Sequence, residues 1–198
     1  MVNRGVARKL SENEVEAWTG PVYYISHLAV ENPKSASTPV RIVFNSSQRC
    51  NGISLNDALA KGPDCYLNNL LGILLRWREG PVVLVGDIRK MFNSIAISEM
   101  DQHCHRFLWR DMNTMEKPKS YVITRVNMGD KPAPAICAEA IQKTATMFQK
   151  SYLEVNRLLN QSIYVDDIVD SVESMSHALN LAKDTEHVLL KGGFQAKG

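Results

Sequence analysis

The chain has 198 residues, which is enough for one large or two small domains with a hydrophobic core. Its 23 Lys and Arg residues nearly balance its 21 Asp and Glu residues, which excludes a histone-like basic protein and argues against a disordered acidic one. The apolar runs are far shorter than the roughly 20 residues of a membrane-spanning helix, and no signal peptide is visible. The cysteines have no paired spacing, which indicates a reducing compartment. We therefore expect an intracellular protein that is neither secreted nor membrane-bound.

Capping residues and apolar periodicity predict several helices. Ser11 and Glu14 have the spacing of a capping box, which predicts a short helix that ends near Trp18. Asp64 is expected to cap a second helix, whose leucines have the spacing of a buried face. These leucines are Leu67, Leu70, Leu71, Leu74 and Leu75. Further helices are expected over residues 98–109, 132–152 and 174–191.

Apolar runs bounded by turn residues predict the strands. Val82 to Val85 form a continuous apolar run, which is typical of a central strand that is buried on both faces. The other strands are expected over residues 22–30, 40–44, 121–126, 162–165 and 168–171. Because strands and helices do not alternate regularly, the pattern favours an α+β fold over a doubly wound one.

Two strand ends carry carboxylates that need an explanation. Asp166 and Asp167 interrupt an apolar hairpin, and Asp87 directly follows the apolar strand. Two charges about 4 Å apart repel by roughly 4 kcal/mol at an effective dielectric of about 20, so a half-buried pair needs a compensating cation. A polar turn or a helix cap would explain either site alone. Residues 32–56, however, contain basic residues and no Asp or Glu. The chain thus combines two acidic strand ends with a separate basic stretch, and this constellation is more specific than either acidic site alone.

This constellation matches phosphoryl transfer assisted by two metal ions. Two magnesium ions about 3.5–4 Å apart activate an attacking hydroxyl and stabilise the leaving oxygen, and such hard cations prefer carboxylate oxygens. The protein then supplies positioning and positive charge for the phosphates. Lys34 and Arg41 lie in the basic stretch and are candidates for that charge.

Three segments resemble, in the correct order, the catalytic motifs of reverse transcriptases. Residues 85–92 (VGDIRKMF) resemble motif A, residues 128–134 (MGDKPAP) resemble motif B, and residues 164–167 (YVDD) resemble the YxDD of motif C. Other segments are most similar to the Pao (BEL/Pao) class of long-terminal-repeat retrotransposons, namely residues 18–24, 54–57 and 191–194.

The resemblance implies a right-hand polymerase fragment of α+β class, with an antiparallel palm sheet packed on helices and no thumb. The fingers are expected over residues 1–79 and 107–128, and the palm over residues 80–106 and 129–198. The thumb, ribonuclease H and integrase domains are expected elsewhere in a full-length element. Without a thumb the chain makes few phosphate contacts with a template–primer duplex, so we expect it to be weakly active or inactive alone.

The resemblance also implies a metal centre. Asp87 and Asp166 would be the main ligands of two Mg²⁺ ions, for which Mn²⁺ can substitute. The backbone carbonyl of Ile88 would assist them, and Asp167 would complete the acidic cluster. Lys197 lies near the position at which the family places a proton donor.

Nucleotide-binding roles follow from the same resemblance. Phe92 would be a steric gate whose ring clashes with a 2′-hydroxyl and so selects deoxynucleotides, and an ordinary core phenylalanine is the alternative. Arg41 would hold the incoming triphosphate, and Lys34 would share that task unless it is a plain solvated loop residue. Met128 and Gly129 would line the nucleotide pocket through their backbone.

The implied function is RNA-directed DNA polymerisation in a cytoplasmic particle or the nucleus. A primer 3′-hydroxyl on an RNA or DNA template would attack the α-phosphate of a deoxynucleoside triphosphate and release pyrophosphate. The alternative is a catalytically inactive, transposon-derived remnant that acts at most as a nucleic-acid or protein binding module. An RNA-directed RNA polymerase or telomerase-type enzyme shares the acidic site, but Phe92 argues against RNA synthesis.

His103, Cys104 and His105 suggest a zinc site at first sight. Adjacent residues of a helix point about 100° apart, and no matching Cys/His pair lies elsewhere in the sequence. We therefore expect no zinc there and place Cys104 in the core.

Overall fold

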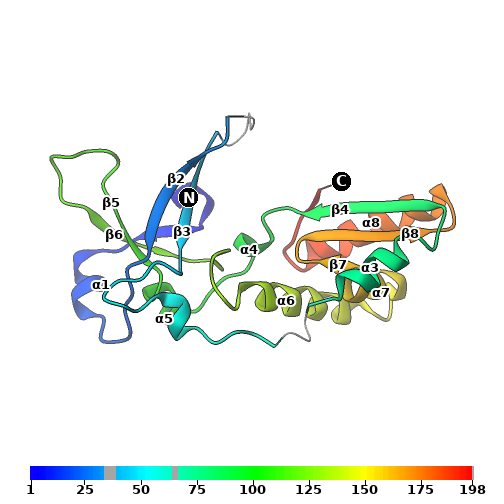
Figure 1. Cartoon of the computed structure of the whole chain (residues 1–198), viewed down its shortest axis with the longest axis horizontal. Helices are drawn as coiled ribbons and strands as arrows, with labels where there is room; N and C mark the ends of the chain where they lie inside the picture. The colour runs from blue at the N-terminus through cyan, green and yellow to red at the C-terminus, as the bar shows by residue number, and fades with distance from the viewer. Residues whose placement is uncertain (34–38, 64–66, 198) are drawn as a thin grey trace. The chain divides into compact units, whose positions relative to one another are not determined.

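The computed structural model of the chain describes residues 1–33, 39–63 and 67–197. The chain forms two compact units, and it passes between them more than once (Figure 1). Unit 1 comprises Met1–Lys61 and Ala96–Ala133, and unit 2 comprises Gly62–Ile95 and Pro134–Gly198.

Unit 1 contains two small antiparallel sheets around an aromatic core. Strands β1 (Ala7–Lys9), β6 (Lys119–Ile123) and β5 (Arg106–Trp109) form one sheet, and β2 (Ser26–Glu31) pairs with β3 (Val40–Asn45) in the other. The rings of Phe44 and Phe107 meet edge to face at 5.0 Å in the core. Its short helices are η1 (Val2–Arg4), α1 (Glu12–Ala17), α2 (Leu55–Ala58) and α5 (Glu99–His103).

Unit 2 contains one antiparallel sheet with helices packed on it. The strands lie in the order β7 (Ile163–Tyr164), β8 (Asp167–Val172), β4 (Val82–Ile88) and β9 (Ala196–Lys197). Helix α8 (Met175–Lys191) contacts β4 and β8 and buries Val188 and Leu189. The other helices are α3 (Leu70–Arg76), α4 (Met91–Ser94), α6 (Ala133–Phe148) and α7 (Leu153–Gln161).

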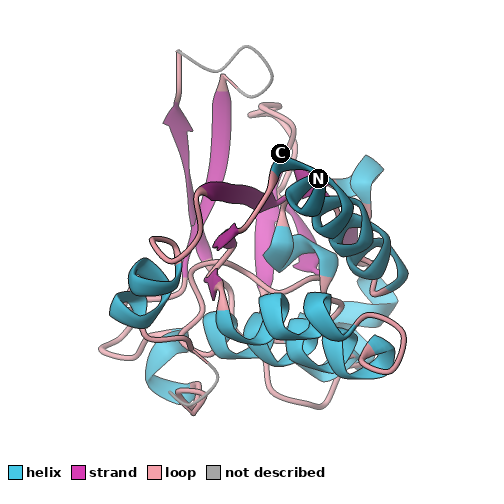
Figure 2. Ribbon diagram, turned by 90° about the vertical axis from the view of Figure 1, so that its right-hand side faces the viewer, coloured by secondary structure: helices cyan, strands magenta, loops and turns pink. Residues whose placement is uncertain are grey.

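The predicted fold class is confirmed, since the chain mixes helices with antiparallel sheets (Figure 2). The capping box at the start of α1 is also confirmed: Ser11 Oγ accepts the Glu14 N–H at 3.2 Å, and Glu14 accepts the Ser11 N–H at 2.8 Å. The predicted hairpin around Asp166 is present as β7 and β8. The structure also contains β1, β9, α2, α4 and α7, which the patterns in the sequence do not predict.

The helix predicted over residues 98–109 is too long. Ser98 caps α5 as expected, but the helix ends at His103, and residues 106–109 form β5. Pairing with β6 buries Phe107 against Ile123 and Phe44 in the core. The distant partner strand therefore determines the conformation here, which a local helix signal does not reveal.

Two predictions of burial are wrong. The leucines predicted to form a buried helix face include Leu71 and Leu75, which are 66% and 60% exposed. Helix α3 instead buries Ile73, because it is short and contacts β7 and β8 through that side. Within β4, Val83 and Val85 are 47% and 62% exposed, so this strand is covered on one face only. Asp64, the predicted cap, lies outside the described residues.

The bounds of the two units differ from the expected bounds of fingers and palm. Residues 62–79 belong to unit 2, where α3 contacts β8. Residues 96–106 belong to unit 1, where α5 contacts β6. The expected bounds of fingers and palm stay a prediction, because the two units are defined by contacts alone.

Candidate active site

The antiparallel pairing in unit 2 places two predicted site residues directly opposite each other. Strands β4 and β8 lie side by side (Figure 1), and Asp87 near the end of β4 pairs with Asp167 at the start of β8. Residues opposite each other in such a ladder have Cβ atoms about 4.5–5.5 Å apart, and like charges there destabilise the pair. The register therefore concentrates negative charge at one end of the sheet.

Asp166 joins this pair through the turn between β7 and β8. Tyr164 pairs with Asp167, which leaves Val165 and Asp166 as the two turn residues. The Ile88 N–H donates to the Asp166 carbonyl oxygen at 2.8 Å, which ties the turn to the end of β4. Asp87, Asp166 and Asp167 are thus brought together as the sequence predicts, and the backbone of Ile88 lies beside them.

Val165 has a backbone conformation that strains the turn. Its φ is 58°, in the left-handed region, which a β-branched residue rarely adopts. This conformation costs an L-residue roughly 1–2 kcal/mol, but it is the conformation that a two-residue hairpin turn requires. The turn that carries Asp166 therefore forms although its first residue, Val165, disfavours the left-handed backbone conformation.

Replacing Val165 with asparagine should relieve this strain. Asparagine tolerates the left-handed region, so we expect Val165→Asn to stabilise the protein by about 0.5–1 kcal/mol. Thermal unfolding of the wild type, Val165→Asn and Val165→Ala checks this, because alanine removes the β-branch without gaining that tolerance. A lower unfolding midpoint for Val165→Asn than for Val165→Ala would show that strain is not the dominant effect.

Burial and neighbouring charge oppose ionisation of Asp166. Its pKa is raised, first by burial and then by the charges of Asp167 and Asp87. Among the described residues, no ion pair includes any of these three carboxylates. Asp170 on the same strand differs, because it is 2% exposed and forms a 2.8 Å ion pair with Arg157. Asp170, a structural carboxylate of this sheet, thus has a cation, whereas Asp87, Asp166 and Asp167 have none among the residues that the structure describes.

The raised pKa predicts that Asp166→Asn is more heat-stable than the wild type without divalent cations. A carboxyl whose folded pKa is raised costs stability above that pKa, and the cost disappears as the pH falls below its ordinary value of 3.8. Because Asp166 is partly exposed and screened, we expect a midpoint rise of at most about 2–4 °C, the shift that about 1 kcal/mol gives at this size. Thermal unfolding of both proteins at neutral pH and at about pH 3 checks this. The difference between their unfolding midpoints should be smaller at the lower pH. A less stable variant at neutral pH would contradict it.

The donor atoms at the strand ends suit a hard divalent cation. Carboxylate and carbonyl oxygens are the ligands that Mg²⁺ prefers. The described side chains include no ready-made group of three or more His, Cys, Asp or Glu ligands. Catalytic Mg²⁺, however, is commonly held by one or two carboxylates together with substrate phosphates and water. The residues present therefore fit an ion that is completed by the substrate.

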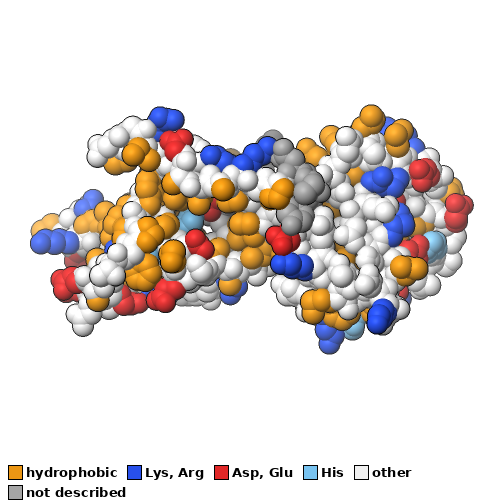
Figure 3. Space-filling model, turned by 90° about the horizontal axis from the view of Figure 1, so that it is seen from below, with side chains coloured by type: hydrophobic (Ala, Val, Ile, Leu, Met, Phe, Trp, Pro, Cys, Tyr) orange, Lys and Arg blue, Asp and Glu red, His pale blue; other side chains and the backbone are white. Residues whose placement is uncertain are grey.

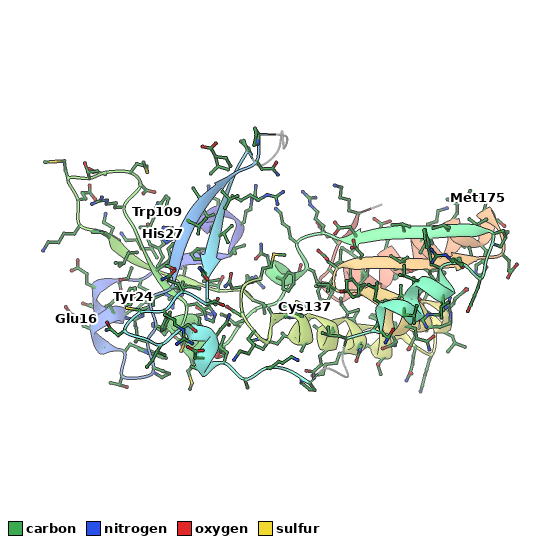
Figure 4. All side chains as sticks on the ribbon, viewed as in Figure 1. Glu16, Tyr24, His27, Trp109, Cys137 and Met175 are labelled. Atoms are coloured by element: carbon green, nitrogen blue, oxygen red, sulfur yellow. The ribbon has the colours of Figure 1, made fainter. Side chains whose placement is uncertain are left out.

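Two further residues lie next to this cluster. Lys197 on β9 pairs with Asp87 on the side opposite Asp167. Cys137 on α6 (Figure 4) is fully buried, and burial together with the charge of Asp166 raises the pKa of its thiol to about 12. Sequence reasoning missed Cys137, since only the packing of α6 brings it near the turn.

Phe92 follows the acidic strand end on α4. Its side chain is 9% exposed, and the chain enters α4 through Lys90, whose φ is 51°. This burial is compatible with a steric gate and with a core residue, so both readings of Phe92 remain.

The other predicted nucleotide-binding residues belong to unit 1. Arg41 is exposed on β3, and Met128 is 73% exposed beside Gly129. A Cβ at Gly129 would lie 2.9 Å from the backbone oxygen of Phe44, so only glycine fits this close approach. The Gly129 carbonyl accepts a hydrogen bond from Asn56 Nδ2 at 3.0 Å. Lys34 lies outside the described residues.

One face of the molecule carries charges of both signs. On the face in Figure 3, Lys and Arg side chains are interspersed with Asp and Glu side chains. None of the helices in the described residues is long and apolar enough to cross a membrane.

Solved structures of viral enzymes resemble this fold. A foamy viral protease–reverse transcriptase in complex with double-stranded DNA is 20% identical over 99% of this chain, with a TM-score of 0.67. A foamy viral protease–reverse transcriptase in complex with an RNA/DNA hybrid is 20% identical over 99% of this chain, with a TM-score of 0.69. The native prototype foamy virus protease–reverse transcriptase is 17% identical over 97% of this chain, with a TM-score of 0.68. The chain spans 28%, 22% and 21% of those longer chains. At these identities the likeness shows the fold alone.

The sequence itself matches a family model. No curated protein sequence matches the chain significantly. The family model for reverse transcriptase (RNA-dependent DNA polymerase), however, matches residues 49–197, which include the paired strands β4 and β8 with their carboxylates. The chain therefore belongs to the reverse transcriptase family.

Proposed function

We propose that the chain is the RNA-directed DNA polymerase domain of a long-terminal-repeat retrotransposon polyprotein, of the BEL/Pao class. It extends a primer by transferring nucleotides from deoxynucleoside triphosphates in a cytoplasmic particle or the nucleus. The observation that carries this proposal is the register of Asp87 opposite Asp167 with Asp166 at the adjoining turn, all three without a cation partner in the described structure. We assign the palm to unit 2, which holds these carboxylates, and the fingers to unit 1.

The strand-end residues hold the metal ions in this proposal. Asp87, Asp166 and the Ile88 carbonyl are the ligands, and Asp167 adds negative charge beside them. When bound, two Mg²⁺ ions, or Mn²⁺ in their place, activate the primer hydroxyl and stabilise the leaving pyrophosphate. Lys197, paired with Asp87, is the candidate proton donor.

The nucleotide is bound by charge and by backbone. Arg41, with Lys34, holds the triphosphate through positive charge, and Met128 and Gly129 line the pocket through their backbone. The requirement for glycine at position 129 supports this role, since a residue without a side chain lets a ligand approach the main chain. The foamy viral relatives are described with double-stranded DNA and with an RNA/DNA hybrid, which supports a template–primer partner.

Phe92→Val tests the steric gate. A smaller side chain leaves room for a 2′-hydroxyl, so we expect the preference for deoxynucleotides over ribonucleotides, as a ratio of kcat/KM values, to fall at least about tenfold. Phe194→Val is the matched control, because Phe194 is also a buried phenylalanine of unit 2, at 3% exposure. If Phe92→Val lowers both kcat/KM values equally, Phe92 is a core residue only.

Primer extension on an RNA template with Mg²⁺ or Mn²⁺ tests the function as a whole. Because the chain makes few phosphate contacts with a template–primer duplex, we expect the wild type to add deoxynucleotides weakly and Asp166→Asn to add none. Equal extension by both proteins would show that these carboxylates are not the catalytic centre. If neither protein extends the primer, the assay is repeated with a thumb joined downstream, and a second blank would favour the inactive remnant that binds nucleic acid or protein.

A further inference from the structure

A buried histidine in unit 1 has hydrogen-bond acceptors at both of its ring nitrogens. His105 lies between α5 and β5 and is 4% exposed. Its Nδ1 is 2.7 Å from the main-chain oxygen of Asp101, and its Nε2 is 2.8 Å from Oδ2 of Asp130. A main-chain carbonyl only accepts, and an ionised carboxylate only accepts. Both ring nitrogens must therefore donate, which requires the doubly protonated imidazolium.

The surroundings of Asp130 place the proton on the imidazole. Asp130 is 8% exposed, and its other oxygen, Oδ1, already accepts from Ser46 Oγ at 2.5 Å and from Asn127 Nδ2 at 2.9 Å. Burial by itself would raise the pKa of Asp130, but His105, Ser46 and Asn127 outweigh it and lower this pKa. A carboxylate with this many donors is held ionised.

The ion pair of His105 and Asp130 contacts the turn that carries Met128 and Gly129. Asp130 closes the turn, since its N–H donates to the Asn127 carbonyl at 3.0 Å while its side chain binds the Asn127 amide. Asn56 braces the same turn, accepting the Lys131 N–H at 2.8 Å. Within the described parts of the chain, the side-chain hydrogen bond from His105 to this turn is the one to Asp130.

We propose that His105 is a positioning residue which, as a buried imidazolium, fixes Asp130 and thereby the backbone of the turn at Met128 and Gly129. The link to nucleotide binding rests on the proposed function, and the ion pair itself does not. The consequence is a turn that loosens as the pH rises through the raised pKa of His105, when the imidazolium loses its proton and one ring nitrogen faces an acceptor without a hydrogen.

The carboxylates around His105 both raise its pKa. Burial alone would lower its pKa, but the hydrogen bond and charge of Asp130, the Asp101 carbonyl and the Asp101 charge raise it. Arg106, the next residue, is engaged elsewhere, because its guanidinium donates to His103 Nδ1 at 3.0 and 2.7 Å. His103 is thus a hydrogen-bond acceptor with a lowered pKa, stacked 3.8 Å from Trp18, and contrasts with His105 two positions away.

Nitrogen NMR of the histidine rings tests the ion pair on the wild-type chain without any activity assay. We expect the His105 ring to keep both nitrogens protonated above its ordinary pKa of 6.5, and His105→Gln identifies its signals. A His105 ring that loses its proton at or below pH 6.5 overturns the proposal, whatever the polymerase does.

Kinetics and amide exchange test the positioning role. Asp130→Asn and His105→Gln should speed amide exchange at Asp130 and Lys131, and should raise the KM for deoxynucleotide more than they lower kcat. We expect a KM increase of about tenfold or more, since a displacement of about 1 Å costs up to about 10²-fold. In the wild type, KM should rise as the pH rises through the raised pKa of His105, and neither variant should show that rise. His103→Gln, which keeps an acceptor for Arg106, should retain the wild-type pH profile.

The outcomes separate this inference from the proposed function. If the wild type extends no primer even with a thumb joined downstream, the polymerase proposal fails, while ring NMR and amide exchange still decide the ion pair and its effect on the turn. If the variants exchange and bind nucleotide as the wild type does, the positioning role is wrong.

Discussion

Asp87→Asn is expected to slow nucleotide addition by at least about 10²–10³-fold, the loss that follows removal of one preorganised electrostatic group from an active site. Asp87 pairs with Asp167 on one side and with Lys197 on the other. Asparagine has nearly the same shape, so the ladder and its backbone hydrogen bonds should persist. What disappears is the negative charge that would hold a divalent cation.

The control for this prediction is Asp184→Asn, which removes an exposed carboxylate from α8. Single-turnover primer extension should show wild-type rates for Asp184→Asn and a severe loss for Asp87→Asn, at similar unfolding temperatures. Mg²⁺ should also raise the unfolding midpoint of the wild type, because a ligand that binds only the folded state stabilises it. An Asp87→Asn protein with wild-type rates would exclude this carboxylate from the catalytic centre.

The second large effect concerns stability. Removing one partner of the buried His105–Asp130 pair leaves an uncompensated charge, so we expect His105→Ala or Asp130→Ala to lower the free energy of unfolding by about 3–5 kcal/mol. Both side chains are nearly inaccessible to water, at 5% and 8% exposure. Because each loss comes from the same pair, the double variant should lose less than the sum of the single ones.

The pH dependence of this loss has a definite sign. The pKa of His105 is raised, so its contribution is complete below the ordinary value of 6.5 and disappears as the pH rises through the raised value. The pKa of Asp130 is lowered, so its contribution is complete above 3.8 and disappears as the pH falls through the lowered value. Denaturant unfolding should therefore show the largest difference between wild type and His105→Ala in mildly acidic solution. A difference that is constant up to strongly alkaline pH would contradict the ion pair.

Local signals in the sequence predicted the parts of the fold that depend on neighbouring residues. Ser11 caps α1 and Ser174 caps α8, because a side-chain hydrogen bond to the third residue of a helix is a local interaction. The acidic strand ends were predictable for the same reason, since carboxylates after apolar runs place Asp87 and Asp166 at the ends of strands. The register of Asp87 with Asp167 followed once the two strands paired.

Features that depend on distant partners could not be predicted in this way. Residues 106–109 carry no sign that β6 will pair with them, and the run over Val82 to Val85 does not say how many faces the helices will cover. His105 and Asp130 lie 25 positions apart. The spacing of His103, Cys104 and His105 suggests a metal site, but the two histidines have opposite hydrogen-bonding roles in the fold. His103 accepts from Arg106, and His105 donates to Asp130.

Template-directed addition of a single nucleotide tests the central claim most directly. The primer is annealed to RNA templates that differ in one base, and the protein is in excess so that weak binding does not hide the chemistry. We predict that the wild type adds the deoxynucleotide complementary to that base in the presence of Mg²⁺, and that Asp166→Asn adds none. Addition that ignores the template base, or no addition at saturating primer–template, would contradict the assignment of an RNA-directed DNA polymerase.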